Sequence, residues 1–336
     1  LYQPLLVSGD GQLTASGVTM DGRLRLSGRS TNIGTVNVTH SFSDAKGMAR
    51  LSGGELVFTQ GGLQLHDLTE RLRGIAVNAS GVLRPSADVL WSGGAMVSTG
   101  DVEIEKLSFS TFRLGEFKGL SGVLSFSDLL GLETNGAQTI TLDELRFTPT
   151  IVLRDGVADV SVLGPQAFYL ESAKWPFVGG ELGIEPTVWR FDSQQQLIRV
   201  TADNWELTRL LGMFQIPDLD VTGRVSGEFP IEIVDANAYF RNARLTAVED
   251  GYIRYDSNIT RSAAQADDYA KMAFDALKNF EYRVMSVGAN GNLTGNIVID
   301  LALSGRNPDV MDGQGFNLNV NLESELAKLV HAGSIS

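Results

Sequence analysis

Cysteine is absent from this chain, and histidine is scarce, occurring only as His40, His66 and His331. Without thiols the chain can form neither a disulfide nor a thiolate metal site. None of the histidines stands in an HExxH or HxH arrangement, so we expect no metal centre. The sequence also lacks the motifs GxSxG, SxxK and GxxxxGK[ST], and we therefore expect neither an enzyme nor a bound cofactor.

Positive charge and long apolar runs are also in short supply. Lysine and arginine number 27 against 40 aspartates and glutamates, which gives a net charge of −13. Such a chain repels nucleic-acid phosphates, so nucleic acid is excluded as a partner. No apolar run approaches the roughly 20 residues of a transmembrane helix. The chain starts at Leu1 without a basic segment or a signal-type apolar core, and we expect a piece of a longer protein whose membrane anchor lies elsewhere.

Strict alternation of apolar and polar residues is what the chain has in abundance. From Asn296 it reads NIVIDLALSG, and from Gly315 it reads GFNLNVNLES. A period of two indicates β-strands with one apolar face. Similar runs recur every 8–12 residues or so, separated by expected turns such as Asp21–Gly22, Gly61–Gly62 and Asp155–Gly156. The pattern predicts a mainly β protein, built as a long antiparallel meander.

Three segments interrupt the alternation and predict helices. Ser127–Leu132 and Trp205–Phe214 are two short ones. A longer amphipathic helix is expected near residues 262–280, as an insertion within Thr260–Phe280 that puts apolar residues on one face and mixed charges on the other. The longer helix either packs on the sheet or acts as a lid over an apolar groove, and the sequence leaves both possibilities open.

The length of the meander itself suggests a function. About 20 strands stacked at about 4.8 Å would extend on the order of 100 Å, and an apolar face of that size cannot stay open to water. It must close into a barrel, fold into a sandwich or curl lengthwise, and the runs are too uneven for a membrane barrel. We expect an elongated open groove, a β-taco, that holds acyl chains. The candidate groove-lining residues are Val160, Val162, Leu182, Ile184, Val221, Val225, Ile297, Ile299, Leu301, Leu303, Leu318 and Val320.

Several blocks of the chain resemble a known family. They include WPFVGGELGIEP (Trp175–Pro186), IPDLDVTGRVSGEFPIEI (Ile216–Ile233) and RLTAVEDGYIRY (Arg244–Tyr255), followed by a block over Ile299–Val330. Residues 120–330 resemble the C-terminal region of the YdbH-like family, which belongs to the AsmA superfamily and is related in architecture to TamB. The resemblance implies a periplasmic, bridge-like protein that moves phospholipid between the inner and outer membranes of a Gram-negative bacterium, held in the inner membrane by an N-terminal anchor that this chain lacks.

The resemblance also implies a partner at the C-terminal end and one continuous groove fragment over residues 1–336. A small outer-membrane lipoprotein, YnbE-like, would add a strand to the edge of the groove, and residues 324–336 would form a tail beyond it. A regular edge strand suits such β-augmentation. The candidate docking strand comprises Gly315, Phe316, Asn317, Leu318, Asn319, Val320, Asn321 and Leu322.

Two other functions stay open at this stage. The chain could be a structural or adhesive β-protein of the cell envelope, or a scaffold, with a closed apolar core. It could also be an envelope carbohydrate-binding or hydrolytic β-protein, which would need clustered tryptophans and facing acids. The sequence shows scattered tryptophans and a pair, Glu103 and Glu105, on one expected strand face. We favour the lipid groove because its apolar face requires no catalytic residues.

Overall fold

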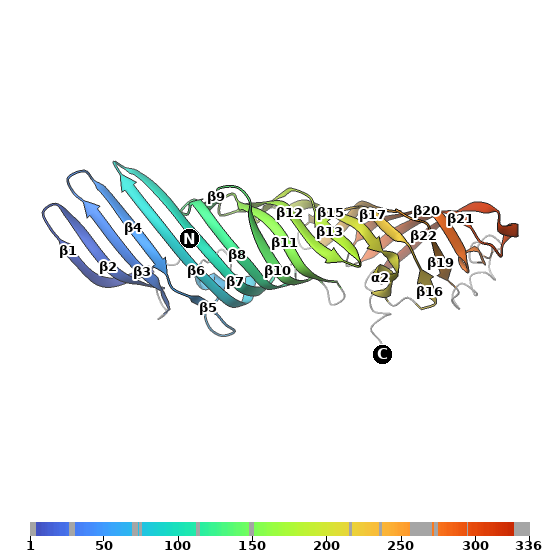
Figure 1. Ribbon diagram of the computed structural model, residues 1–336, viewed down its shortest axis with the longest axis horizontal. Coiled ribbons are helices and arrows are strands. Elements are labelled where there is room, and N and C mark those ends of the chain that lie inside the picture. Colours follow the sequence, from blue (N-terminus) through green and yellow to red (C-terminus); the bar gives the residue numbers. More distant parts are fainter. Residues whose placement is uncertain are drawn as a thin grey trace. The chain divides into compact units, whose positions relative to one another are not determined.

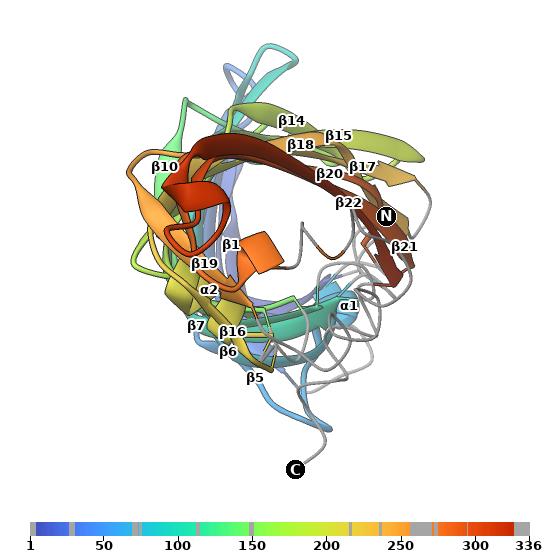
Figure 2. The same ribbon diagram turned by 90° about the vertical axis from the view of Figure 1, so that its right-hand side faces the viewer.

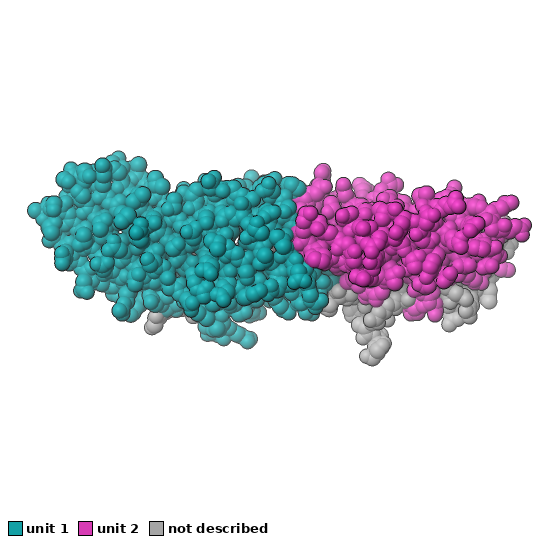
Figure 3. Space-filling view, in the orientation of Figure 1, with its two compact units in different colours: residues 1–173, 186–192 teal, residues 174–185, 193–336 magenta. Residues whose placement is uncertain are grey.

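The computed structural model describes residues 5–26, 31–68, 73, 76–111, 115–147, 151–214, 217–234, 237–255, 271, 275–293 and 295–325. Over these residues the fold is mainly β: 22 strands belong to one antiparallel sheet, and the helices are short (Figure 1). The chain forms two compact units, coloured separately in Figure 3. Unit 1 comprises Leu1–Ala173 and Pro186–Asp192, and unit 2 comprises Lys174–Glu185 and Ser193–Ser336.

Unit 1 is a meander in which each strand pairs mainly with its sequence neighbours. Pairing runs from β1 to β4, then through β6, β7, β8 and β10 to β11, while β5 pairs with the first half of β6. Its elements are β1 (Leu5–Leu13), β2 (Gly17–Leu26), β3 (Asn32–Ser41), β4 (Lys46–Gly53), β5 (Leu56–Phe58), α1 (Leu65–Leu68), β6 (Ala76–Ser92), β7 (Ala95–Thr111), β8 (Gly115–Asp128), β9 (Glu133–Thr134), β10 (Gln138–Arg146), β11 (Val152–Val162) and β14 (Thr187–Arg190).

Strand β12 (Ala167–Phe177) contributes residues to both units, and unit 2 continues the antiparallel order. Within unit 2 the pairs run β13–β15, β15–β17, β17–β18, β18–β20, β20–β21 and β21–β22. Its elements are β13 (Gly180–Ile184), β15 (Gln195–Glu206), α2 (Leu207–Gly212), β16 (Leu219–Val221), β17 (Arg224–Val234), β18 (Asn237–Ala247), β19 (Gly251–Tyr255), β20 (Phe280–Asn292), β21 (Asn296–Arg306), the 3-10 turn η2 (Met311–Gly313) and β22 (Gly315–Glu325).

Part of the unit 2 sheet turns back over its own face. Strand β16 pairs with β19, and β19 pairs with Phe280–Tyr282 of β20, whereas residues 286–292 of β20 pair with β18. The chain therefore bends between β16 and β17, at Gly223 with φ +103°, and again between β18 and β19. We call β16, β19 and residues 280–282 the lip. Figure 2 shows β16 on the side of unit 2 across from β17 and β18.

β-Bulges occur inside several strands, and three of them share one construction. Lys106, Asn204 and Asn242 adopt positive φ where the strand register shifts. A bulge leaves one amide out of the ladder. In each of these three the amide donates to a side-chain oxygen of the neighbouring strand, at 3.1, 2.8 and 2.6 Å respectively; the acceptors are Ser121 Oγ, Ser226 Oγ and Asn290 Oδ1. Each bulge shifts the alternation by one residue, so the same face stays apolar on both sides of it.

Two predicted turns are wrong. Asp21–Gly22 lies inside β2, and Asp155–Gly156 lies inside β11, where Asp155 has φ +57°. Gly9 faces Gly22 across the β1–β2 pair, and a Cβ at Gly9 would clash with the backbone of β2, so close backbone approach accounts for these glycines. Gly61–Gly62 is a turn as predicted, with Gly61 at φ +80°.

Of the two short predicted helices, one is wrong and the other is shorter than predicted. Ser127–Leu132 is not a helix: β8 ends at Asp128 and a turn follows, because the Asp128 carboxylate accepts the amide of Gly131 at 3.0 Å and Ser98 Oγ at 2.9 Å. Trp205–Phe214 contains α2, but Trp205 and Glu206 still pair with β17, so the helix spans only Leu207–Gly212.

The long helix predicted near residues 262–280 lies mostly outside the described residues. Residues 271 and 275–277 are helical, residues 278–279 form a turn, and Phe280 begins β20. Of the predicted tail 324–336, Ser324 and Glu325 belong to β22, and residues 326–336 lie outside the described part.

Candidate functional site

Unit 1 presents an apolar face built from directly opposed residues. Leu56 pairs with Leu83, Leu83 with Ile104, and Val102 with Leu124, so these side chains stand on one side of four strands. A buried cluster forms on this face, to which α1 contributes Leu65. Its buried members are Leu24, Leu26, Ile33, Leu56, Phe58, Leu63, Leu65, Ala76, Ala79, Ile104 and Leu107.

The opposite face of unit 1 is charged and wet. Arg84 lies 2.9 Å from Glu55 and 2.6 Å from Glu105, and these carboxylates hold the pKa of Arg84 above its ordinary value. Hydrogen bonds from Lys118 and Arg146 lower the pKa of Glu144 to about 2. Such solvated pairs contribute little stability each. Glu103 and Glu105 therefore face Arg84 rather than another acid across a cleft, which gives no support to a glycosidase.

Unit 2 carries an apolar face across seven strands. The cross-strand register links Leu182 with Ala202, Val200 with Phe229, and Ile198 with Ile231. It continues through Ile231 and Phe240, Val287 and Leu301, and Leu303 and Leu318. Polar residues occupy the alternate positions, for example Asp300 opposite Asn321, whose side chains are joined at 2.6 Å. The sheet of unit 2 therefore has one apolar and one polar face.

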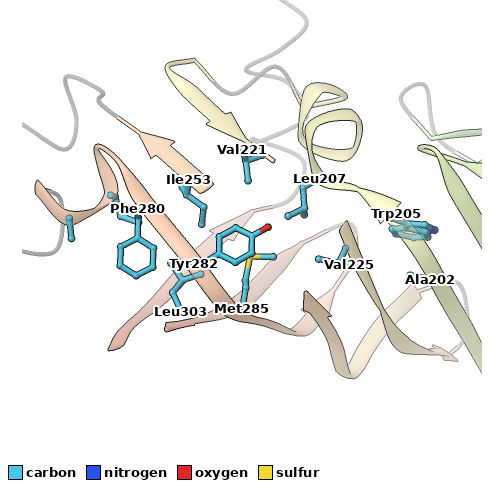
Figure 4. Packing of buried hydrophobic residues seen from close by; sticks show 12 residues of the cluster. Ala202, Trp205, Leu207, Val221, Val225, Ile253, Phe280, Tyr282, Met285 and Leu303 are labelled. Carbon is cyan, nitrogen blue, oxygen red and sulfur yellow. The ribbon is translucent and has the colours of Figure 1, made fainter. Parts of the chain in front are cut away.

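The lip and α2 cover part of this apolar face and form a packed core with it. Phe280, Tyr282 and Val225 are at most 1% exposed, and Figure 4 shows Val221 and Ile253 of the lip opposite Met285 and Val225. The buried members of this core are Ala202, Trp205, Leu207, Val221, Val225, Ile253, Ala276, Leu277, Phe280, Tyr282, Met285 and Leu303. This part of the face is as dry as an ordinary protein interior.

The Tyr282 hydroxyl holds the bend of the lip. It donates a hydrogen bond of 2.6 Å to the carbonyl oxygen of Thr222, directly before Gly223. A Cβ on Gly223 or on Gly251 would clash with this hydroxyl, so both glycines make room for it. Burial raises the pKa of Tyr282 to about 12, which keeps the hydroxyl protonated as the donor.

The rest of the face is apolar but only half-buried. Ile184, Ile198, Ile231, Phe240, Ile299 and Val320 belong neither to the core nor to the residues packed against it. They are spread over β13, β15, β17, β18, β21 and β22. An aromatic row leads towards them from the core: the ring centroids of Trp205 and Phe229 are 5.2 Å apart, and those of Phe229 and Phe240 are 6.4 Å apart.

Sequence reasoning identified many residues of these faces and missed others. The predicted residues Leu182, Ile184, Val225, Ile297, Ile299, Leu301, Leu303, Leu318 and Val320 all lie on the apolar face of unit 2. Val160 shares a face of unit 1 with Ile140, and Val162 follows it in the same strand. Val221 lies on the lip, so it faces Val225 across the core instead of standing beside it. Their contact with lipid stays a prediction.

The aromatic residues Trp205, Phe229 and Phe240 were missed for different reasons: Trp205 was assigned to a predicted helix, Phe240 lies on a strand with a bulge, and Phe229 follows the regular alternation of β17. The bulge at Asn204 brings Trp205 onto the face of Ala202, and the bulge at Asn242 does the same for Phe240 and Ala243. Asn204, directly before Trp205, is the signal that could have located the bulge in β15.

The predicted docking strand forms β22. It pairs in register with β21 over all of Gly315–Glu325, and β21 is its one partner among the described residues. Asn317, Asn319 and Asn321 are exposed, while Leu318 and Val320 are half-buried on the apolar face. Strand β22 therefore offers a regular backbone edge.

In the described ranges, no three His, Cys, Asp or Glu side chains gather closely enough to hold a metal ion. No helix found among the described residues has the length and apolar character to cross a membrane. A family model described as "YdbH-like: Intermembrane phospholipid transport protein YdbH" matches residues 4–336. Neither a curated protein nor a solved structure matches the chain.

Proposed function

Because the chain belongs to the YdbH-like family of intermembrane phospholipid transport proteins, we propose that its apolar sheet face is the surface that carries the phospholipid acyl chains. The observation that supports this most is the half-buried apolar area of unit 2, which spans strands from β13 to β22. Exposed apolar patches of this kind usually bind a ligand or a partner, whereas a scaffold with a closed core does not need one.

The energetics of apolar burial explain how such a face allows movement. Each buried CH₂ group of an acyl chain contributes about 0.8 kcal/mol, and the contribution is nearly equal at neighbouring apolar positions. A lipid can therefore move from Ile231 to Phe240, or from Ile299 to Val320, without entering water. The phosphate headgroup stays hydrated, since transfer of a charged group from water to an apolar surface is unfavourable.

We further propose that β22 receives a strand from a small outer-membrane lipoprotein. Main-chain groups along one edge of a regular strand pair readily with an added strand. Strand β22 is 11 residues long and has one partner in the described part of the chain. In this proposal the protein works in the periplasm of a Gram-negative cell. One continuous groove over residues 1–336 stays a prediction.

The competing function, a scaffold with a closed apolar core, rests on the packed core of unit 2. Val225 and Phe280 are fully buried there, as such a scaffold requires. The half-buried positions Ile231 and Ile299 favour lipid over a closed core, because a close-packed interior would bury them too.

An aspartate at Ile299 tests the proposed surface. Ile299→Asp puts a charge on the half-buried apolar face, and we expect it to lower the binding of a fluorescent phospholipid at least several-fold while the fold persists, since charge in contact with acyl chains is unfavourable. Ala302→Asp, on the exposed polar face of the same strand, is the matched control and should bind like the parent protein. Equal binding by both variants would contradict the proposal.

A further inference from the structure

The apolar face of unit 2 contains positions that pack against the buried core and positions that do not, and single strands contain both kinds. On β21, Leu301 packs against the buried core and Ile299 does not, although both side chains stand on the same face. On β17, Phe229 packs against the core and Ile231 does not. All four are half-buried, so their average exposure does not reveal the difference.

We propose that acyl chains in unit 2 are confined to the part of the face that the core leaves free, which we call the open strip. Its members are Ile184, Ile198, Ile231, Phe240, Ile299 and Val320. Lipid then does not enter the core beneath the lip. Phe229, Leu301 and Leu318 lie at the border between this core and the open strip. This inference rests on the proposed function and adds where on the face the lipid lies.

The packing of the core is the physical reason for the confinement. A close-packed interior has no space for further methylene groups, so lipid could enter it only by displacing the side chains already there. Tyr282 and Phe280 fill the space between lip and sheet, and the hydrogen bond from Tyr282 to Thr222 keeps the lip closed. The open strip keeps apolar surface in contact with water, which an acyl chain can cover.

The register places three members of the open strip side by side on neighbouring strands. Ile198 lies directly opposite Ile231, and Ile231 lies directly opposite Phe240. On β20 the small residues Gly291 and Ala289 lie between Phe240 and the strand β21, and Ala289 lies directly opposite Ile299. Six spacings of about 4.8 Å separate β13 from β22, which gives the strip a length of about 29 Å.

Photo-crosslinking on matched pairs tests the confinement. The amino acid p-benzoylphenylalanine is introduced singly at Ile299 and Leu301, which share a strand face, and at Ile231 and Phe229, a second such pair on another strand. The intact protein is irradiated in cells, purified, and analysed by mass spectrometry for phospholipid adducts. Ala302, on the polar face, is the background position, and circular dichroism verifies that each variant is folded.

Several-fold more adduct at positions 299 and 231 than at 301 and 229 is the expected result. Equal adduct formation within both pairs, or more at 301 and 229, would overturn the confinement and leave the proposed function intact. If all four positions stay at the background of position 302 and no phospholipid co-purifies, the proposed function itself fails, and the open strip fails with it.

Discussion

At the scale of single residues, Tyr282 shows how one side chain fixes the shape of a sheet. Its hydroxyl reaches across to the Thr222 carbonyl, and Gly223 and Gly251 make room for it. The sequence offers no sign of this contact, because Thr222 and Tyr282 are far apart in the chain and the alternating run over Leu219–Ile233 reads as one straight strand. Only the positive φ of Gly223 separates β16 from β17.

Tyr282→Phe should weaken unit 2 without changing its apolar packing. The substitution leaves the partly buried carbonyl of Thr222 with one hydrogen bond fewer, and we expect the free energy of unfolding to fall by about 1 kcal/mol at pH 8, measured by urea denaturation. Tyr252→Phe, which removes an exposed hydrogen bond to Asp220, is the control and should cost less.

The folding stability of Tyr282→Phe should also depend on pH differently from that of the parent protein. Because the pKa of Tyr282 is raised to about 12 from an unfolded value near 10, the unfolded chain ionises first as the pH rises. The parent protein therefore loses stability between pH 10 and pH 12, and Tyr282→Phe lacks that loss. The stability gap between the two proteins should narrow over this interval, and a gap that is constant with pH would contradict the buried-donor assignment.

At the scale of strands and helices, alternation predicted the β architecture, and bulges limited the prediction. Runs such as Asn296–Arg306 and Gly315–Glu325 contain no bulge of their own, and their apolar faces are those predicted from sequence. In β15 and β18 the bulges at Asn204 and Asn242 shift the alternation, so a strict period of two assigns Trp205 and Phe240 to the wrong face. The amides freed by these bulges depend on Ser226 and Asn290, which are distant in sequence.

The short helices were harder to predict than the strands. Ser127–Leu132 has a helical composition, but Asp128 forms a turn with its own side chain and with Ser98. Helix α1, Leu65–Leu68, has four residues, which are too few to show a helical period in the sequence. These are cases in which a side-chain contact outweighs local propensity.

Strand β22 leads to a prediction at this scale. Hydrogen exchange should be slower in β21, which pairs on both sides, than in β22, which pairs with β21 alone among the described residues. Adding the small outer-membrane lipoprotein should slow exchange in β22 specifically, with β2 of unit 1 as the internal reference. Unchanged exchange in β22 on formation of a complex would show that the partner docks elsewhere.

At the scale of the whole molecule, each of the two units has one apolar and one polar sheet face. In each, one sheet face is apolar and partly covered by short elements, α1 in unit 1 and the lip with α2 in unit 2. The other face carries ion pairs such as Arg84–Glu55 and hydrogen bonds such as Asn321–Asp300. The sequence predicted one apolar and one polar sheet face, and it predicted lipid transport as the class of function. The sequence did not predict the short elements that cover part of the apolar face, because they depend on contacts between distant residues.

The most direct test of the central claim, that the apolar face carries phospholipid, is native mass spectrometry of the intact protein with lipid extraction from the same sample. The account predicts co-purified phospholipid, released on denaturation and depleted in Ile299→Asp but not in Ala302→Asp. A lipid-free mass in the parent protein, together with failure to take up added phospholipid, would contradict the account and favour a scaffold with a closed apolar core.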